Sequence, residues 1–442
     1  MEELILMSAG DAAAMIREGR VTSEELTTAF LDQIARLEDQ VAAWAFLEPE
    51  LALKQAKDAD QALQAGRPLG PLHGIPVGIK DIIDTRDMPT EDGTVLHAGR
   101  RPVEDATLVS RLRQVGAVIL GKTVTTELAV FGPGKTRNPH DLERTPGGSS
   151  SGSAAAVAAG MVPLAVGTQT NGSVIRPASF CGVYGYKPTF GSISRHRVLP
   201  QSRPLDQVGV FGRSIGDVAL IAEALMGFDP NDPDTRPVAR PALVKTQAEE
   251  PPVPPKLAFV KTPVWGQAEE TTREAFAEIV DQLGERAAEL ELPDIFTTAH
   301  EQHRIIMEAD LARSFDREYT EGREQLTAIL REMLERGNQI RAVDYNNAVA
   351  DTQTLYRNFD KIFEWHDAII TPAVIGEAPV GLGSTGSPVF CTIWTLCGMP
   401  AVTLPLLQGA NGMPLGLQLV GPRGDDARLL RTANWLAAEL GS

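Results

Sequence analysis

The sequence predicts an α/β fold: a single large domain in which a central mixed β-sheet is surrounded by helices. Short apolar segments rich in β-branched residues alternate with helical patterns through the first half of the chain and again near its end. The 442 residues are 43% hydrophobic, which is enough for one large core. A mostly helical, highly charged block at 269–365 separates the two halves, and we interpret it as an insertion or cap that shapes substrate access.

The first half of the chain starts with a helix. Thr22 and Glu25 fit a capping box, so a helix is predicted from there to about Leu37. The elements that follow are expected as helices at 51–65, 108–115, 151–159 and 214–226, and as strands at 71–84, 117–120, 161–166 and 208–211.

The second half begins after a proline-rich stretch. Eight prolines fall within residues 230–255, which predicts a surface connection over 230–256 and not a core element. A domain boundary at this place is the alternative. We prefer one domain over 1–442, because matching chemistry lies on both sides. The expected elements are helices through 269–365, strands at 368–370, 399–406 and 413–421, and a closing helix at 425–440.

Composition argues against several classes of protein. The formal net charge is −17, and such a surface repels phosphate backbones and anionic lipids, so neither nucleic acid nor a membrane is expected as a partner. The three cysteines are too few for a disulfide framework, and no signal-peptide pattern is present, which favours a cytoplasmic location. No Cys/His cluster has zinc-ligand spacing, so no metal or cofactor is expected. The sequence leaves the oligomeric state open, a homodimer included.

One literal motif match is misleading. Residues 116–123 read G-A-V-I-L-G-K-T and fit the pattern of a phosphate-binding loop. That loop needs free backbone amides between a strand and a helix, whereas the middle of this segment is A-V-I-L and a helix precedes it. The segment is therefore predicted to be a buried strand.

Two serines and one lysine form the candidate catalytic site. Ser149 and Ser173 are separated by a helix of roughly 10 residues, about 15 Å long, and by a strand that covers roughly 20 Å in the return direction. Lys80 ends the strand-like segment 75–79. Because open α/β sheets place ligands at strand ends, we expect the three side chains to meet there.

These residues can support catalysis without histidine. Serine is a poor nucleophile until a base removes its proton, and no histidine lies in a G-x-S-x-G context. Lys80 can be that base if burial lowers its pKa from about 10.4 toward 7, which costs roughly 4 kcal/mol. The alternative is a surface lysine with Asp81 as its neighbour. Ser149 can pass the proton between the amine and Ser173.

Several segments together resemble the amidase signature family. They read H-G-I-P-V-G-I-K-D (73–81), T-P-G-G-S-S-S-G-S-A-A-A-V-A-A-G (145–160), G-T-Q-T-N-G-S (167–173), C-G-V-Y-G-Y-K-P-T (181–189), G-M-P-A-V-T-L-P (398–405) and G-M-P-L-G-L-Q-L-V-G (412–421). The resemblance spans about residues 5–440 and is weakest over 230–390. It implies a Ser–cis-Ser–Lys hydrolase in which Ser173 is the nucleophile, Ser149 is the bridging serine in a cis peptide and Lys80 is the base.

The sequence also departs from the usual family pattern. Backbone amides of residues 170–173 (Thr170, Asn171, Gly172 and Ser173) are the expected oxyanion hole, although Asn171 replaces a glycine and Gln169 replaces an acid. We expect Asn171 to take the place of that glycine in the loop, because asparagine tolerates positive φ. Arg176 lies one place later than the usual arginine, and this register resembles the malonamidase-type branch, in which the arginine holds a substrate carboxylate. A structural salt bridge is the alternative role. Pocket walls are expected from 131–135, beginning with Phe131 and Gly132, and from 300–395.

The resulting hypothesis is an amidase. It would hydrolyse a small amide, aryl amide or carbamate to a carboxylic acid and an amine or ammonia through a Ser173 acyl-enzyme. Two alternatives stay open. One is the subunit of a glutamine-dependent amidotransferase that acts with a partner chain and tRNA, against which the negative charge argues. The other is a non-catalytic binder that kept the fold.

Overall fold

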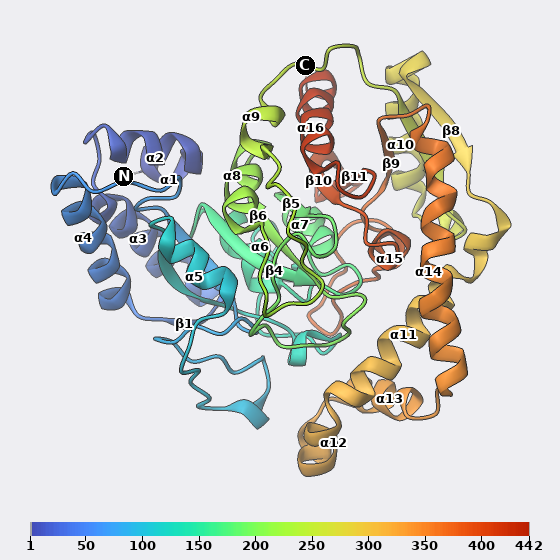
Figure 1. Ribbon diagram of the computed structural model, residues 1–442, viewed down its shortest axis with the longest axis horizontal. Helices are drawn as coiled ribbons and strands as arrows, with labels where there is room; N and C mark the ends of the chain where they lie inside the picture. The colour runs from blue at the N-terminus through green and yellow to red at the C-terminus, as the bar shows by residue number, and fades with distance from the viewer. Residues whose placement is uncertain (1, 442) are drawn as a thin grey trace.

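A single mixed sheet forms the centre of the molecule (Figure 1). The computed structural model describes residues 2–441, and the eleven strands found there lie in the order β1-β3-β2-β4-β6-β5-β10-β11-β9-β7-β8. They are β1 Trp44–Leu47, β2 Pro76–Lys80, β3 Val118–Thr123, β4 Leu164–Gln169, β5 Tyr184–Lys187, β6 Gln207–Gly212, β7 Leu257–Lys261, β8 Ala287–Glu291, β9 Ala368–Pro372, β10 Ala401–Gln408 and β11 Pro414–Val420. The predicted α/β class with one large domain is confirmed.

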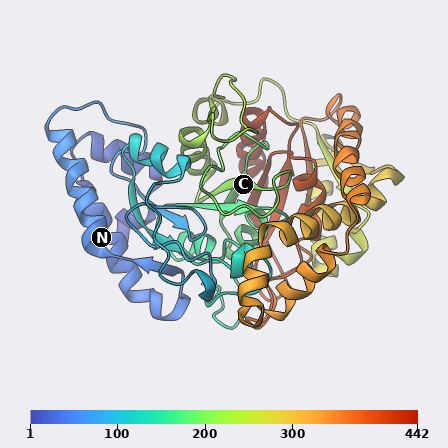
Figure 2. The ribbon, with the colours of Figure 1, turned by 60° about the horizontal axis from the view of Figure 1, so that its bottom comes forward.

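Helices lie around the sheet and leave the edge strand β8 mostly exposed (Figure 1). They are α1 Glu2–Leu6, α2 Ala9–Arg17, α3 Ser23–Val41, α4 Pro49–Gln64, α5 Thr107–Gln114, α6 Ser151–Ala158, α7 Ile175–Cys181, α8 Ile215–Leu225, α9 Leu243–Gln247, α10 Glu270–Leu283, α11 Ala299–Ser314, α12 Asp316–Gly322, α13 Ala328–Gly337, α14 Ala342–Phe363, α15 Val389–Leu396 and α16 Asp426–Leu440. Figures 1 and 2 show α1–α4 at one end of the sheet and the group α11–α14 at the other. No helix within residues 2–441 combines the length and apolar character that crossing a bilayer requires.

Parallel pairing brings the carboxyl ends of β2, β3 and β4 to the same end of the sheet. β2 is parallel to both β3 and β4, with Lys80 opposite Thr123 and Ile79 opposite Val166. The carboxyl end of β2 therefore lies beside that of β4, where the chain enters the loop that carries Ser173. Beyond β4 the sheet becomes antiparallel through β6, β5, β10, β11 and β9.

The local sequence patterns gave most element positions correctly. The capping box of α3 is present, with the Thr22 side chain accepting from the Glu25 backbone amide. The strand expected at 161–166 instead begins at Leu164 and continues to Gln169. Pro163 explains the late start, because its missing N–H cannot join the ladder. The extension matters because it places Thr168 within the strand.

The helical block contains a strand that the sequence patterns did not reveal. β8 pairs in parallel with β7 at the sheet edge, and its residues are mostly exposed. An exposed edge strand of sequence A-A-E-L-E has no apolar alternation, so no strand was predicted within this mostly helical block. Leu326, Leu330, Met333 and Leu334 do form the predicted packing face, and all four are buried.

A substitution in the buried helix α6 tests how closely the core is packed. In α6, a Cβ added at Gly152 would lie 2.2 Å from the Ala43 carbonyl oxygen and 2.3 Å from the Val124 nitrogen. We expect Gly152→Ala to lower the free energy of unfolding by about 3 kcal/mol, because backbone atoms cannot yield. Gly10→Ala in α2, where the nearest atom would be 3.8 Å away, should be neutral or stabilising by about 0.5 kcal/mol. Urea unfolding measures both, and a wild-type midpoint for Gly152→Ala would contradict this packing.

Candidate active site

Lys80 is the fully buried centre of the site. Its side chain ends β2, and its Nζ donates to Ser149 Oγ at 2.7 Å and to Thr168 Oγ1 at 2.9 Å. Burial lowers the pKa of Lys80 well below its ordinary value, while the charge of Asp206 acts in the opposite direction. A neutral amine in contact with a serine hydroxyl is the arrangement that lysine-assisted nucleophilic chemistry needs.

The alternative pairing of Lys80 with its neighbour Asp81 is wrong. The Asp81 carboxylate instead lies 3.0 Å from Nζ of Lys122, which is itself fully buried in β3. Lys122 also donates to Thr90 Oγ1 and to the Pro89 carbonyl oxygen. The lysine of the G-x-x-x-x-G-K-T match is thus a structural ion-pair partner within a strand.

The turn before α6 presents Ser149. The Gly148–Ser149 peptide bond is cis, as the family resemblance implies. Gly147 has φ of 81°, a conformation that favours glycine, and a Cβ there would touch Pro177 of α7. Ser151 fixes the turn by donating to the Gly147 carbonyl oxygen at 2.8 Å.

The loop between β4 and α7 carries Ser173. The Ser173 side chain is half-buried, and within residues 2–441 the backbone N–H groups of Asn171, Gly172 and Ser173 make no hydrogen bond. Gln169, which replaces the usual acid, accepts from the amides of Val174 and Ile175 at 2.8 and 3.0 Å. It thereby satisfies the first amides of α7 and leaves those of the loop available.

Asn171 does not adopt the positive φ that the sequence suggested. Its side chain accepts from Thr392 Oγ1 at 2.8 Å, so α15 holds it in place. The neighbouring Gly172 also has no positive φ; a Cβ there would lie 2.9 Å from Pro388. Close packing against the 388–392 segment, and not backbone conformation, explains the residues at these two positions.

Arg176 connects the two serine-bearing segments. Its Nη2 donates to the carbonyl oxygen of Gly148 at 2.7 Å, and its Nη1 donates to that of Gly386 at 2.7 Å. The side chain is buried, its Nε has no partner, and within residues 2–441 it makes no ion pair. Burial lowers the pKa of Arg176 to about 10. The structural salt bridge considered from the sequence is therefore not formed within the described chain.

A cavity of about 360 Å³ lies beside the Ser173 loop. Its walls come from Phe131, Asn171, α11, α13 and α15, and Met307 and Met333 supply apolar surface. The Phe131 ring also lies 5.9 Å from the Arg176 guanidinium. Gly132 does not line this cavity; a Cβ there would lie 3.0 Å from Thr327.

The sequence reasoning missed several residues that contact the site. Thr168 binds Lys80, and a signal was available, since alternate residues of an extended segment share a side and Thr168 precedes Thr170 by two. His303 of α11 donates from Nε2 to the Thr170 carbonyl oxygen at 2.9 Å, and burial lowers its pKa to about 4. Nothing in the local sequence links His303 to a loop 133 positions away.

The family follows from a match that covers most of the chain. Residues 25–430 match the family model described as Amidase. This chain belongs to the amidase family. Within that family it is similar to a subunit of the glutamyl-tRNA(Gln) amidotransferase of Salinispora arenicola, with 34% identity over 490 aligned positions that cover all of this chain and 99% of the relative.

Solved structures of the family share the whole fold. A chain of the structure described as an unexpected vestigial protein complex that reveals the origins of an s-triazine catabolic enzyme has a TM-score of 0.91 and 27% identity, covering 98% of this chain and 99% of that one. The native peptide amidase of Stenotrophomonas maltophilia has a TM-score of 0.85 and 30% identity, covering 99% and 97%. The family match and the solved structures together describe this chain as an amidase-family enzyme that acts on C–N bonds.

Proposed function

We propose that this protein hydrolyses the C–N bond of a small amide through an acyl-enzyme on Ser173. The observation that carries the proposal is the contact between the fully buried Lys80 amine and Ser149, with no carboxylate of residues 2–441 bound to that amine. Burial favours the neutral amine, which can take a proton from Ser149. The peptide amidase relative lends support, since it is an amide-cleaving enzyme with the same fold over nearly its whole length.

The reaction follows from these groups. Ser173 Oγ attacks the amide carbonyl carbon, its proton passes to Ser149 Oγ, and the Ser149 proton passes to Lys80 Nζ. Collapse of the tetrahedral intermediate breaks the C–N bond, and the leaving nitrogen takes a proton back through the same relay. Water then attacks the ester on Ser173, which releases the carboxylic acid and restores the hydroxyl.

The loop amides are proposed to stabilise the oxyanion. Amides of residues 170–173 follow the end of β4, and those of Asn171, Gly172 and Ser173 are free of partners within the described chain. Preorganised donors of this kind typically contribute about 10²–10³-fold to the rate. The cavity bounded by Phe131 and the helices α11 and α13 is the proposed place of the acyl group, which agrees with the expectation that the helical block shapes access.

The buried cation suggests what the substrate carries. Arg176 has an unpartnered Nε and no acidic partner within residues 2–441, so its charge is uncompensated. A substrate carboxylate near it would supply that compensation, because arginine pairs well with carboxylates and a lone buried charge is costly. We therefore propose an amide that also bears a free carboxylate.

A substrate panel tests this assignment. Arg176→Met is expected to lower kcat/KM about 100-fold for carboxylate-bearing amides and much less for matched neutral amides, through loss of a charge-assisted hydrogen bond. Arg423→Met is the control, since Arg423 is a half-buried arginine that donates to the Cys397 carbonyl oxygen. An equal loss for both substrate classes would assign Arg176 a purely structural role, in which it holds the Gly148 and Gly386 carbonyl oxygens.

A second function is favoured by the curated relatives. Those at 34% and 35% identity are glutamyl-tRNA(Gln) amidotransferase subunits, which fits a glutamine-dependent subunit that works with partner chains. Against this, the net charge is −17, and the 490-position alignment means that the relative has segments absent from this chain of 442 residues. Ammonia release from glutamine by the purified protein, with no turnover of other amides, would favour the subunit over the hydrolase.

A further inference from the structure

Thr170 is held by a hydrogen-bond network of polar side chains behind the Ser173 loop. Its Oγ1 lies 2.6 Å from Gln201 Oε1 and 2.6 Å from Asp206 Oδ1. Gln201 Nε2 donates to the Leu128 carbonyl oxygen at 3.0 Å. Leu128 has φ of 46° and precedes Phe131 in the same short segment. These hydrogen bonds thus connect Asp206 both to the proposed oxyanion loop and to a wall of the cavity.

If Asp206 is ionised, these contacts have one proton too few to form a hydrogen bond at each of them. Thr170 has a single hydroxyl proton, yet both of its 2.6 Å neighbours are acceptor oxygens. Rotating the Gln201 amide does not help, since its oxygen would then face the Leu128 carbonyl oxygen at 3.0 Å. The other carboxylate oxygen, Oδ2, is already occupied by the amides of Gln201 and Ser202 at 2.8 and 2.9 Å. Only a proton on Oδ1 supplies a donor for every contact.

We propose that Asp206 acts as a protonated carboxylic acid that positions the Ser173 loop through Thr170. The acid donates to Thr170 Oγ1, and Thr170 then donates to Gln201. On its other side, the Thr170 carbonyl oxygen accepts from the neutral His303 of α11. Thr170 is fixed from both sides, and the amides that follow it keep their direction.

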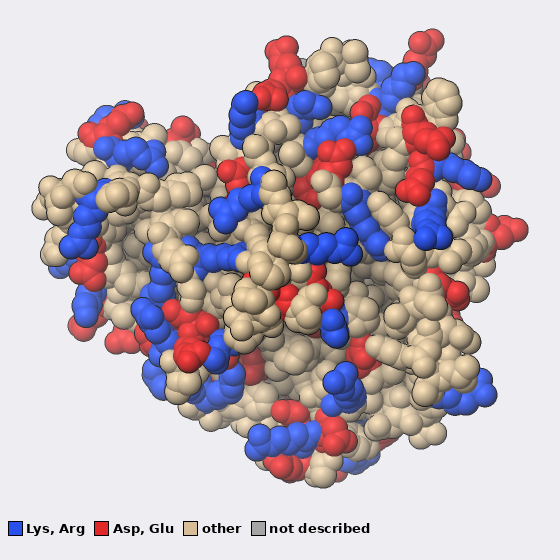
Figure 3. Space-filling model, in the orientation of Figure 1, with Lys and Arg blue, Asp and Glu red and all other residues tan. Residues whose placement is uncertain are grey.

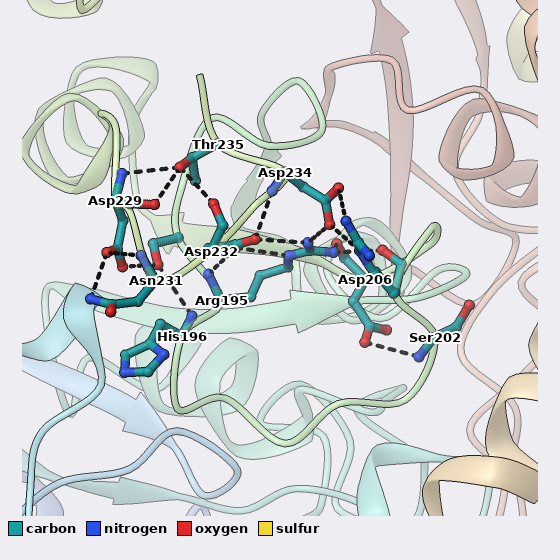
Figure 4. Close-up of polar contacts among 11 residues, drawn as sticks. Arg195, His196, Ser202, Asp206, Asp229, Asn231, Asp232, Asp234 and Thr235 are labelled. Carbon is teal, nitrogen blue, oxygen red and sulfur yellow. Dashed lines mark hydrogen bonds and ion pairs between the residues drawn. The ribbon is translucent and has the colours of Figure 1, made fainter. Parts of the chain in front are cut away.

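The charges around Asp206 are compatible with a retained proton. The guanidinium of Arg195 donates to the Asp206 backbone oxygen and pairs with Asp232 and Asp234, so it does not bind the carboxyl group (Figure 4). Burial raises the pKa of Asp206 to about 6, with the Thr170 contact, the two amides and the charge of Arg195 opposing. The adjoining pocket also contains His196, Arg197 and Arg203; Arg197 pairs with Glu104, and Arg203 pairs with Asp234.

Protonation of Asp206 also bears on Lys80. An ionised Asp206 favours the ammonium form of Lys80, whereas the neutral acid does not. The protonated acid therefore maintains both a fixed loop and a neutral base. This consequence for catalysis depends on the proposed function, while the protonation itself does not.

Infrared spectroscopy tests the protonation directly. In the difference spectrum of wild type minus Asp206→Asn at about pH 5, where ordinary aspartates are ionised, we expect the carbonyl stretch of a carboxylic acid that shifts in D₂O. Asp426→Asn is the matched control. Asp426 is equally engaged with a threonine, Thr189, but every partner is a donor and Thr189 Oγ1 otherwise accepts from Gly424, so no band is expected. Absence of the Asp206 band would overturn the proposal.

The functional consequence is read from the rate at which a fluorophosphonate probe labels Ser173 across pH. In wild type the rate should rise as Lys80 loses its proton and fall as Asp206 loses its own. Asp206→Asn, whose amide still donates to Thr170, should keep the rise and lose the fall, whereas Thr170→Val should label about 10-fold more slowly. Labelling of Asp206→Asn as slow as that of Thr170→Val would contradict the proposal. Failure of wild type to label at any pH would remove the proposed function, and the infrared band would still decide the state of Asp206.

Discussion

Ser173→Ala is expected to lower the rate of amide hydrolysis by about 10⁴-fold or more, because the proposed acyl-enzyme cannot form. The half-buried hydroxyl lies in a loop whose amides are free within the described chain, and it makes no hydrogen bond there that the fold depends on. The variant should therefore unfold at nearly the wild-type urea concentration. Steady-state hydrolysis of the preferred panel amide, with mass spectrometry of the probe-labelled peptide, measures the effect.

A neighbouring serine provides the control. Ser153→Ala removes a buried hydroxyl of α6 that donates to the Val166 carbonyl oxygen and does not contact Lys80. We expect it to cost roughly 1 kcal/mol of stability with little change in labelling of Ser173. If Ser173→Ala retained wild-type turnover, or the probe labelled another serine, the nucleophile would be assigned wrongly.

Lys80→Met is expected to reduce the rate by about 10³-fold or more while stabilising the protein. The loss follows from removing the group that accepts the Ser149 proton, a general-base contribution of about 10²–10⁴-fold. The gain follows from burial, since an apolar side chain of similar length replaces an amine that has no carboxylate partner in the described chain. A variant that is less active and also more stable is typical of a catalytic group that is held at a cost in stability, and it separates a catalytic lysine from a structural one.

The same substitution should change the pH dependence. Burial lowers the pKa of Lys80, so the folded protein binds fewer protons than the unfolded chain in the interval between the lowered and the ordinary pKa. Stability should therefore increase with pH over that interval, and this slope should be smaller in Lys80→Met. Activity of the wild type should rise as pH passes the lowered pKa, because only the neutral amine can accept a proton.

Lys187→Met is the matched control for both measurements. Lys187 is another fully buried lysine, with its pKa lowered to about 7, but it donates to Gln207 and to the carbonyl oxygens of Pro188 and Met399. Its removal should alter stability without removing the reaction. Wild-type rates in Lys80→Met would end the lysine-base mechanism.

Surface charge bears on the choice between the two functions. On the face shown in Figure 3, Lys and Arg side chains are interspersed with Asp and Glu, so the net charge of −17 is not gathered into one acidic patch there. An excess of negative charge still weakens long-range attraction to phosphate. Glutamine turnover is thus a sharper test than charge.

Short-range patterns predicted much of the fold correctly. The capping box at Thr22, the Ala-rich run that became α6 and the apolar segments that became β3 and β6 depend on neighbours within a few residues. The short strands β1, β5, β7 and β8 were not predicted, and β4 begins later than expected because Pro163 interrupts the apolar run. The candidate catalytic lysine and serines were identified from motifs, and the contact between Lys80 and Ser149 is present.

By itself, the sequence determined which side chains could do chemistry and at which strand or helix ends they lie, because those features are set by composition and local periodicity. Only the tertiary structure decided their protonation and partners. Asp81 pairs with Lys122, so the buried Lys80 has no carboxylate partner in the described chain. His303 of the distant helix α11 donates to the Thr170 carbonyl oxygen. The contacts of Thr170 with Gln201 and Asp206 need one more proton than an ionised Asp206 supplies. The reason is physical: pKa values and hydrogen-bond partners depend on desolvation and on groups far apart in the chain, which no local pattern encodes.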